Sequence, residues 1–308
     1  MSFTAKDVQA LREKTGCGMM DCKKALTESN GDMEKAVEIL REKGIAAAEK
    51  KASRVAAEGI VDAFVADDGK TGVVVEVNSE TDFVSKNADF QAFVREVGLT
   101  IAKNAPADLD ALLNMKCASF DTTVAELLRE KIQTIGENLT IRRFYRAQGV
   151  VSTYVHSGGR IGVLAEFDAS ESVAENPGFA EFAKDISMQI AAMSPRFLSK
   201  DTVPSDEIDK EREILLAQIK NDDKLKNKPE QVIQKMVEGR LGKYYEANCL
   251  LEQVFIKDGA MTVAAYVAAK AKEFGGAISV KNFTRFEKGE GVQKKEDDFA
   301  AEVANMVK

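Results

Sequence analysis

An internal repeat constrains the fold of this 308-residue chain more than any other feature of its sequence. Residues 59–78 read GIVDAFVADDGKTGVVVEVN, and residues 149–168, which lie 90 positions further on, read GVVSTYVHSGGRIGVLAEFD. Each segment has two runs rich in aliphatic and β-branched residues on either side of a glycine-containing turn. This pattern is typical of an antiparallel hairpin, so we expect the chain to form the same hairpin twice.

The match continues beyond the hairpin. Residues 86–106 align with residues 175–195, and both segments carry phenylalanine and aliphatic residues at the spacing of one helical face. Residues 123–146 align with residues 262–285, and both indicate a helix, a glycine stop and a strand. The sequence therefore predicts an α+β fold with a duplicated β-β-α-α-β core, in which antiparallel sheets are covered by helices.

The second copy contains an insertion, between residues 196 and 261, that the first copy lacks. Apolar residues recur there at heptad-like spacing on both sides of the polar stretch 220–228, which predicts a coiled-coil hairpin. A passive spacer and a contact arm are equally compatible with this pattern. The predicted organisation is an N-terminal helical module (1–43), a linker (44–58), core repeat one (59–148), core repeat two (149–291) with the hairpin at about 203–250, and a C-terminal helical module (292–308).

Residues 1–43 show three short helical segments, which resemble the ubiquitin-associated type of small three-helix bundle. Ahead of the second segment, Met19 and Met20 follow flexible glycines. Methionine suits adaptable protein contacts, although filling a core is its commoner role. The alanine- and lysine-rich residues 44–58 are interpreted as a linker, and residues 297–308 as a short amphipathic helix.

The composition argues against several kinds of chemistry. Histidine occurs once, at His156, and none of the four cysteines forms a CxxC pair, so neither a zinc site nor a histidine-dependent triad is expected. The net charge of −7 argues against a general affinity for nucleic acid. No apolar run approaches the roughly 20 residues of a membrane span, and the first residues resemble no targeting peptide. We expect a cytoplasmic binding protein that has no cofactor, binds no metal and is not an enzyme.

The two copies differ in the connection that leads from the second strand to the helix. The first copy reads NSETDFVSK over residues 78–86, whereas the second reads DASESVAE over residues 168–175 and has no aromatic residue there. A phenylalanine in a connection usually reaches back into the core. Because the second copy is expected to fold without one, Phe83 is predicted to be exposed and to act as a wedge.

Five motifs together resemble one protein family over nearly the whole chain. They are LREKTGCGMMDCKKAL (11–26), EVNSETDFVSKNADFQAF (76–93), TIGENLTIRR (134–143), VEGRLGKYYEANCLLEQVFI (237–256) and RFEKGEG (285–291). On these motifs the chain resembles the bacterial translation elongation factor Ts family. The resemblance implies a guanine nucleotide exchange factor for the G protein elongation factor Tu, with the architecture described above.

The resemblance also implies a mechanism without bond chemistry. In the family, the stretch that corresponds to Thr81, Asp82, Phe83 and Val84 displaces the Mg²⁺ that holds nucleotide in the partner. By this resemblance Phe83 inserts between two helices of the partner's G domain, and Asp82 holds the loop or contacts the partner's backbone. GDP release and GTP binding follow, and no nucleic acid, membrane or small-molecule substrate is needed.

Further contacts with the partner are implied at other positions. Ile135 and Gly136 correspond to family residues that pack beside the wedge, and His156 corresponds to a contact with the G domain. The second core half is implied to touch a distal domain of the partner. The N-terminal module is implied to contact another helix of the G domain through Met19, Met20 and Lys23.

Two other functions compete with this one. The first is an adaptor that binds a protein partner through residues 1–43, and removal of these residues would abolish its activity. This hypothesis leaves the duplicated core and the Asp82-Phe83 difference between the copies unexplained. An enzyme that uses carboxylates of the core predicts a small-molecule pocket and pH-dependent turnover, and the plentiful carboxylates leave it open. The single histidine and the lack of a phosphate-binding loop argue against the enzyme.

Overall fold

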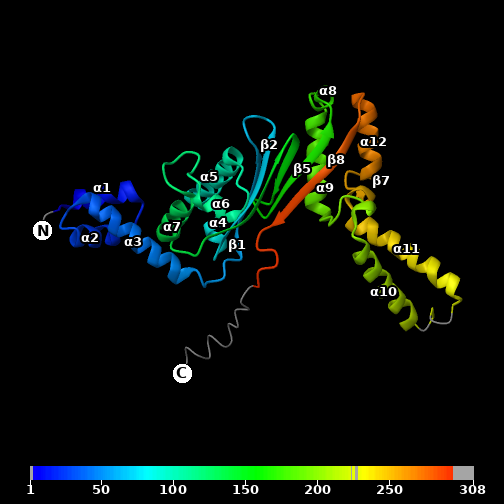
Figure 1. Cartoon of the computed structure of the whole chain (residues 1–308), viewed down its shortest axis with the longest axis horizontal. Coiled ribbons are helices and arrows are strands. Elements are labelled where there is room, and N and C mark those ends of the chain that lie inside the picture. The colour runs from blue at the N-terminus through cyan, green and yellow to red at the C-terminus, as the bar shows by residue number, and fades with distance from the viewer. Residues whose placement is uncertain (1–2, 223, 226–227, 294–308) are drawn as a thin grey trace.

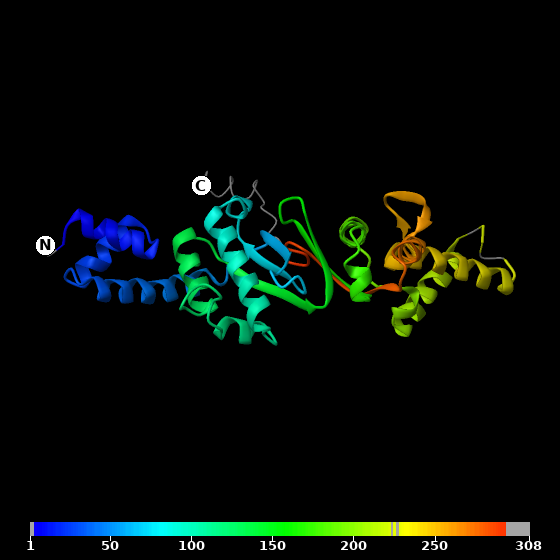
Figure 2. The same ribbon diagram turned by 90° about the horizontal axis from the view of Figure 1, so that it is seen from above.

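The computed structural model describes residues 3–222, 224–225 and 228–293. Figure 1 shows an elongated arrangement, with the N-terminal helices at one end, two sheets in the middle, and the helical pair α10 (Ser205–Asn221) and α11 (Glu230–Asn248) at the other end. The view from above has the same order (Figure 2). None of the described helices is long and apolar enough to cross a membrane. The helix predicted at 297–308, and almost all of the module predicted at 292–308, lie outside the described residues.

Three helices form the N-terminal module: α1 (Ala5–Thr15), α2 (Met19–Glu28) and α3 (Met33–Lys51). Helix α1 begins at a capping box between Thr4 and Asp7, and it ends at Gly16 in the left-handed conformation. The three helices enclose a small apolar core that includes Val8, Leu11, Cys22, Leu26 and Leu40.

Helix α3 is longer than the sequence predicted. It continues through Gly44 to Lys51, so the first part of the segment 44–58, which is predicted to be a linker, is helical. Alanine and lysine are strong helix formers, and α3 packs along α7 (Val124–Ile135) of the first core unit. A Cβ atom at Gly44 would lie 2.7 Å from the Gln133 side chain, so glycine permits the close approach of the two helices.

The first core unit contains strands β1 (Glu58–Val65), β2 (Thr71–Ser79) and β3 (Thr140–Gln148), paired antiparallel in the order β1-β2-β3. The connection from β2 to β3 contains α4 (Asp82–Ser85), α5 (Ala88–Asn104), α6 (Leu109–Asn114) and α7. Alternate residues of β2 point toward these helices. The core between them includes Val73, Val75, Val77, Phe90, Phe93 and Val97.

The second core unit has the same antiparallel strand order. Its sheet is β4 (Val150–His156), β5 (Ile161–Ala169) and β8 (Ile278–Glu287), with helices α8 (Glu171–Ala174), α9 (Phe179–Met193) and α12 (Val263–Phe274). Its order of elements is also the same, apart from α6 in the first unit and the inserted elements between α9 and α12 in the second. The rings of Phe167, Phe179 and Phe182 pack together in its core.

The two sheets pack on each other through small residues. A Cβ atom at Gly72 would lie 2.4 Å from a Leu164 methyl group, and one at Gly162 would lie 2.4 Å from a Val61 methyl group. These glycines occupy matching positions of the two copies, and they let the faces of the sheets approach. The N–H of Val61 also donates a hydrogen bond to the carbonyl of Gly159, at 2.8 Å.

The helical hairpin lies where the insertion predicts it. Helices α10 and α11 share a core that includes Ile208, Leu215, Ile219, Val237 and Leu241. The chain then forms a short antiparallel pair, β6 (Val254–Phe255) and β7 (Asp258–Thr262), before α12. The sequence did not predict this pair, because β6 is too short to show an alternating pattern.

Candidate protein-interaction site

The single-turn helix α4 presents an exposed aromatic ring. We call residues 81–85 the Phe83 turn. Phe83 is 78% exposed, as the comparison of the two copies predicts, whereas Val84 is only 7% exposed and belongs to the first core. The hydroxyl of Ser79 donates to the carbonyl of Thr81 at 2.9 Å, and that of Ser85 donates to the carbonyl of Asp82 at 2.5 Å. The turn is therefore held in place by the packing of Val84 in the first core and by these two hydrogen bonds.

The equivalent turn of the second unit shows which residues the fold requires. Helix α8 follows β5 just as α4 follows β2, and Val173 is buried in the second core as Val84 is in the first. The position of Phe83 is taken there by Ser172, which is exposed. The fold thus needs the valine and does not need the phenylalanine.

Glu137, in the connection between α7 and β3, holds the start of the Phe83 turn. One carboxylate oxygen of Glu137 accepts hydrogen bonds from the backbone N–H groups of Glu80 and Thr81, both at 3.0 Å. The other oxygen accepts one from the Thr81 hydroxyl at 2.6 Å. Hydrogen bonds to an ionised acceptor are stronger than neutral ones, so this contact fixes the turn relative to the end of α7.

Ile135 and Gly136 lie beside the same turn. Ile135 is the last residue of α7 and is half-buried against the first core. Gly136 is exposed and ends the helix in the left-handed conformation, with φ of 88°. Because Glu137 comes next and binds Thr81, the structure brings these two residues to the Phe83 turn.

A second exposed apolar patch lies on α2, in the N-terminal module. Met19 is 44% exposed and Met20 is 61% exposed, and Lys23 is exposed one turn further on. Core filling, the commoner role of methionine, does not apply to either residue. This patch and the Phe83 turn lie on different parts of the molecule (Figure 1).

His156 ends β4 and precedes the turn of the second hairpin. Its side chain is exposed, and the ring nitrogen Nδ1 lies 3.1 Å from the Tyr154 hydroxyl. The ring centroids of Tyr154 and His156 are 6.0 Å apart. Among the described residues, no carboxylate forms a hydrogen bond with this ring. The exposed ring is therefore accessible to a partner.

Comparison with known proteins identifies the family. The model of the family described as elongation factor TS matches residues 80–290. Elongation factor Ts of Clostridium perfringens strain 13 is 52% identical over 307 residues, covering 99% of both chains. Elongation factor Ts of Clostridium kluyveri strain NBRC 12016 is 49% identical over 309 residues, with the same coverage. The chain belongs to the elongation factor Ts family.

The sequence-based prediction of the site did not include Glu137. The repeat contains a signal for this residue, because the second copy has Gly276 at the matching position. The two copies therefore differ at the glycine stop, where Glu137 lies, as well as in the connection after the second strand.

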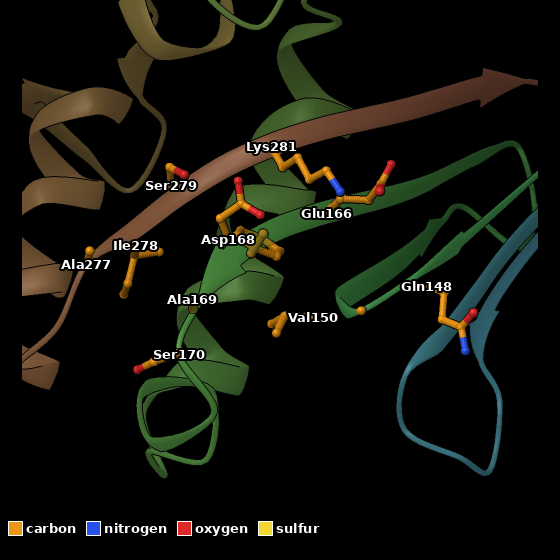
Figure 3. A pocket seen from close by; sticks show the side chains of 12 residues that line it. Gln148, Val150, Glu166, Asp168, Ala169, Ser170, Ala277, Ile278, Ser279 and Lys281 are labelled. Atoms are coloured by element: carbon orange, nitrogen blue, oxygen red, sulfur yellow. The ribbon is translucent and has the colours of Figure 1, made fainter.

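A hollow of about 570 Å³ lies at one end of the second sheet in this family member (Figure 3). Glu166 and Asp168 of β5 and Lys281 of β8 line it. One oxygen of Glu166 already accepts hydrogen bonds from Tyr145 of β3 at 2.8 Å and from Asn282 of β8 at 3.0 Å. Glu166 therefore joins the two sheets. Within residues 3–222, 224–225 and 228–293, no three His, Cys, Asp or Glu side chains are grouped as metal ligands.

Proposed function

We propose that this chain is a guanine nucleotide exchange factor in translation elongation. Its place in the elongation factor Ts family supports the role in elongation and points to elongation factor Tu as the partner. The chain binds the GDP form of the partner, displaces its Mg²⁺ and promotes release of GDP, so that GTP can bind. It acts in the cytoplasm, where elongation takes place.

The exposure of Phe83 on a fixed turn carries this proposal. An aromatic ring held in place before binding enters a partner with little loss of conformational entropy. The second unit has a serine at this position, so the ring serves no purpose in the fold. Insertion of Phe83 between two helices of the G domain moves the groups that hold Mg²⁺ and phosphate.

The other residues of the turn have different roles in this mechanism. Asp82 is exposed beside the ring and contacts the partner's backbone. Thr81 links the turn to Glu137. Val84 anchors the turn in the core, so we assign it no direct contact with the partner. No covalent bond forms or breaks, so the chain acts without a cofactor and is not an enzyme.

The remaining contacts extend the interface along the molecule. Ile135 and Gly136 pack beside the inserted ring, and His156 touches the same G domain. The second core unit reaches a distal domain of the partner. The N-terminal module contacts another helix of the G domain through Met19, Met20 and Lys23.

The architecture fits this assignment. We infer that the two core units arose by duplication, because their element order and their matching glycines agree. We also infer that residues 1–43 form a module of the ubiquitin-associated type and that α10 and α11 form a short coiled coil. The shared apolar cores of the three N-terminal helices and of the hairpin support these two inferences.

Thermodynamic linkage provides the test. If the chain weakens GDP binding by some factor, GDP must weaken binding of the chain by the same factor. Isothermal titration of the chain into nucleotide-free elongation factor Tu and into its GDP·Mg²⁺ form measures both affinities. We expect much tighter binding to the nucleotide-free form. Equal affinity for the two forms contradicts the exchange function.

A second candidate, an adaptor that works through the N-terminal module, is favoured by the exposure of Met19 and Met20. The substitution Met20→Ala in the full chain separates the two functions. If the chain is an exchange factor, the Met20→Ala variant still accelerates GDP release from elongation factor Tu but binds it more weakly. If the chain is an adaptor, Met20→Ala abolishes partner binding and Phe83→Ala leaves partner binding unchanged.

A further inference from the structure

Three segments that are far apart in the sequence meet at the base of the Phe83 turn. They are the stretch 51–54, which begins at the last residue of α3, residues 80–81, and the connection 137–138 between α7 and β3. The N–H of Asn138 donates to a Glu80 carboxylate oxygen at 2.6 Å, and the Asn138 side-chain amide donates to the carbonyl of Arg54 at 2.8 Å. Asn138 is buried, and both of these hydrogen bonds are partly buried.

Charged groups at the end of α3 complete the junction. The Arg54 guanidinium lies 3.4 Å from the Glu80 oxygen that accepts from Asn138. The ammonium group of Lys51 donates to the carbonyl of Ile132 at 3.1 Å, in the last turn of α7. Burial lowers the pKa of Lys51, and the charge of Arg54 contributes to the shift. A cation at the C-terminal end of a helix is favourable, so Lys51 fastens α3 to α7.

Two carboxylates thus exchange contacts across the junction. Glu137 accepts from the backbone of residues 80–81, and Glu80 accepts from the backbone of Asn138. The second core unit lacks this arrangement. Gly276 and Ala277 stand where the first unit has Glu137 and Asn138, and the second unit folds without them.

We propose that Glu80, Glu137 and Asn138 are positioning residues that lock the Phe83 turn to the end of α3. The N-terminal module, with Met19 and Met20, and the Phe83 turn therefore meet the partner as one prearranged unit. This inference rests on the proposed exchange function for its consequence, but the lock is a property of the chain alone. Prearrangement raises affinity because the ordering cost is not incurred on binding.

A distance measurement on the free chain tests the lock directly. The four native cysteines are buried, so spin labels can be attached at exposed sites through Lys24→Cys on α2 and Lys86→Cys at the end of α4. Double electron–electron resonance then gives the distribution of distances between the labels. We expect one narrow distribution in the parent chain and a broader one with Asn138→Ala or Glu137→Ala. An unchanged distribution in both variants overturns the lock.

The exchange assay tests the consequence of the lock. We expect Glu137→Ala to slow GDP release by about tenfold, which is comparable with loss of the Phe83 ring itself. Glu137→Gln keeps an acceptor oxygen and should stay within about twofold of the parent chain. In a chain that already carries Phe83→Ser, Glu137→Ala should have no additional effect, because Glu137 acts through the ring. Full additivity of the two substitutions overturns the positioning role.

A matched control removes a carboxylate of the first unit that is remote from the junction. Asp121 pairs with Lys116 at 2.5 Å on the surface, and Asp121→Ala should change neither the distances nor the rate. Failure of the parent chain to accelerate GDP release defeats the proposed function, while the distances still decide the lock. Acceleration by the parent chain with full activity of Glu137→Ala and Asn138→Ala defeats the role of the lock in exchange, and the distances again decide the lock itself.

Discussion

Replacement of Phe83 by serine, the residue at the matching place of the second unit, separates exchange from stability. Full burial of a phenylalanine side chain contributes about 1.5–3 kcal/mol. Because 78% of the side chain is exposed in the free protein, insertion into a partner buries most of it and contributes about 1.2–2.3 kcal/mol. At about 1.4 kcal/mol per factor of ten, Phe83→Ser should slow accelerated GDP release by roughly 7- to 45-fold. Any larger acceleration by the parent chain must come from the rest of the interface.

The assay is release of a fluorescent GDP analogue from elongation factor Tu, followed by stopped flow at fixed Mg²⁺. Stability should change by less than about 0.5 kcal/mol, since the ring is exposed, so the melting temperature should move by less than about 2 °C. Phe120→Ser, at another phenylalanine of the first unit that is 54% exposed, is the control and should leave release unchanged. Normal acceleration by Phe83→Ser refutes the wedge. A large drop in melting temperature refutes the interpretation that the fold does not need the ring.

Three further predictions concern buried groups. Val84→Ala removes two methyl groups from the first core and should lower the free energy of unfolding by about 2 kcal/mol in chemical denaturation. Glu76 is fully buried, and its carboxylate pairs with Arg142 at 3.0 Å and Arg143 at 2.6 Å. Glu76→Ala should lower the free energy of unfolding by about 3 kcal/mol, and a decrease below about 1 kcal/mol contradicts this. Burial raises the pKa of Cys249 to about 11, so at pH 8 only about one thiol in a thousand is ionised and reaction with dithionitrobenzoate should be very slow until the chain unfolds. Because the thiolate is the nucleophile, the reaction should speed up as the pH approaches 11, and rapid labelling at pH 8 contradicts the burial.

The fold was predictable where the sequence repeats a physical constraint. Glycine occurs at the matching positions 72 and 162 because each residue lies against the opposite sheet. The strand and helix patterns occur twice because the helices of each unit cover one face of that unit's sheet. The linker 44–58 was only partly predicted. Its many small residues give no amphipathic signal in the sequence. In the structure they let α3 lie close to α7, and Lys51 donates a hydrogen bond to α7.

The candidate site was predictable for Phe83 and not for its support. A large apolar residue in a connection is conspicuous when the matching connection has none. Glu137 is one of many carboxylates in an acidic chain, and its role depends on the approach of segments 80–81 and 137–138, which are distant in the sequence. Pairing of this kind follows from the tertiary fold, so local patterns do not show it.

The exposure of Met19 and Met20 also depends on the tertiary structure. Methionines at these positions fit either a core or a surface, and only their exposure on α2 distinguishes the two. Val84 is implied as a contact residue only by the family resemblance of the stretch 81–84, and its side chain is buried in the free chain. In a single-turn helix, neighbouring residues point in different directions, and Val84 faces the core.

The most direct test of the exchange function is catalytic turnover at low concentration of the chain. Elongation factor Tu loaded with fluorescent GDP is mixed with excess unlabelled GDP and a small fraction of one equivalent of this protein. We predict that each molecule of the chain discharges many molecules of the partner, so that fluorescence decays completely and at a rate proportional to the amount of chain added. A decay that matches spontaneous release at every concentration of the chain contradicts the account.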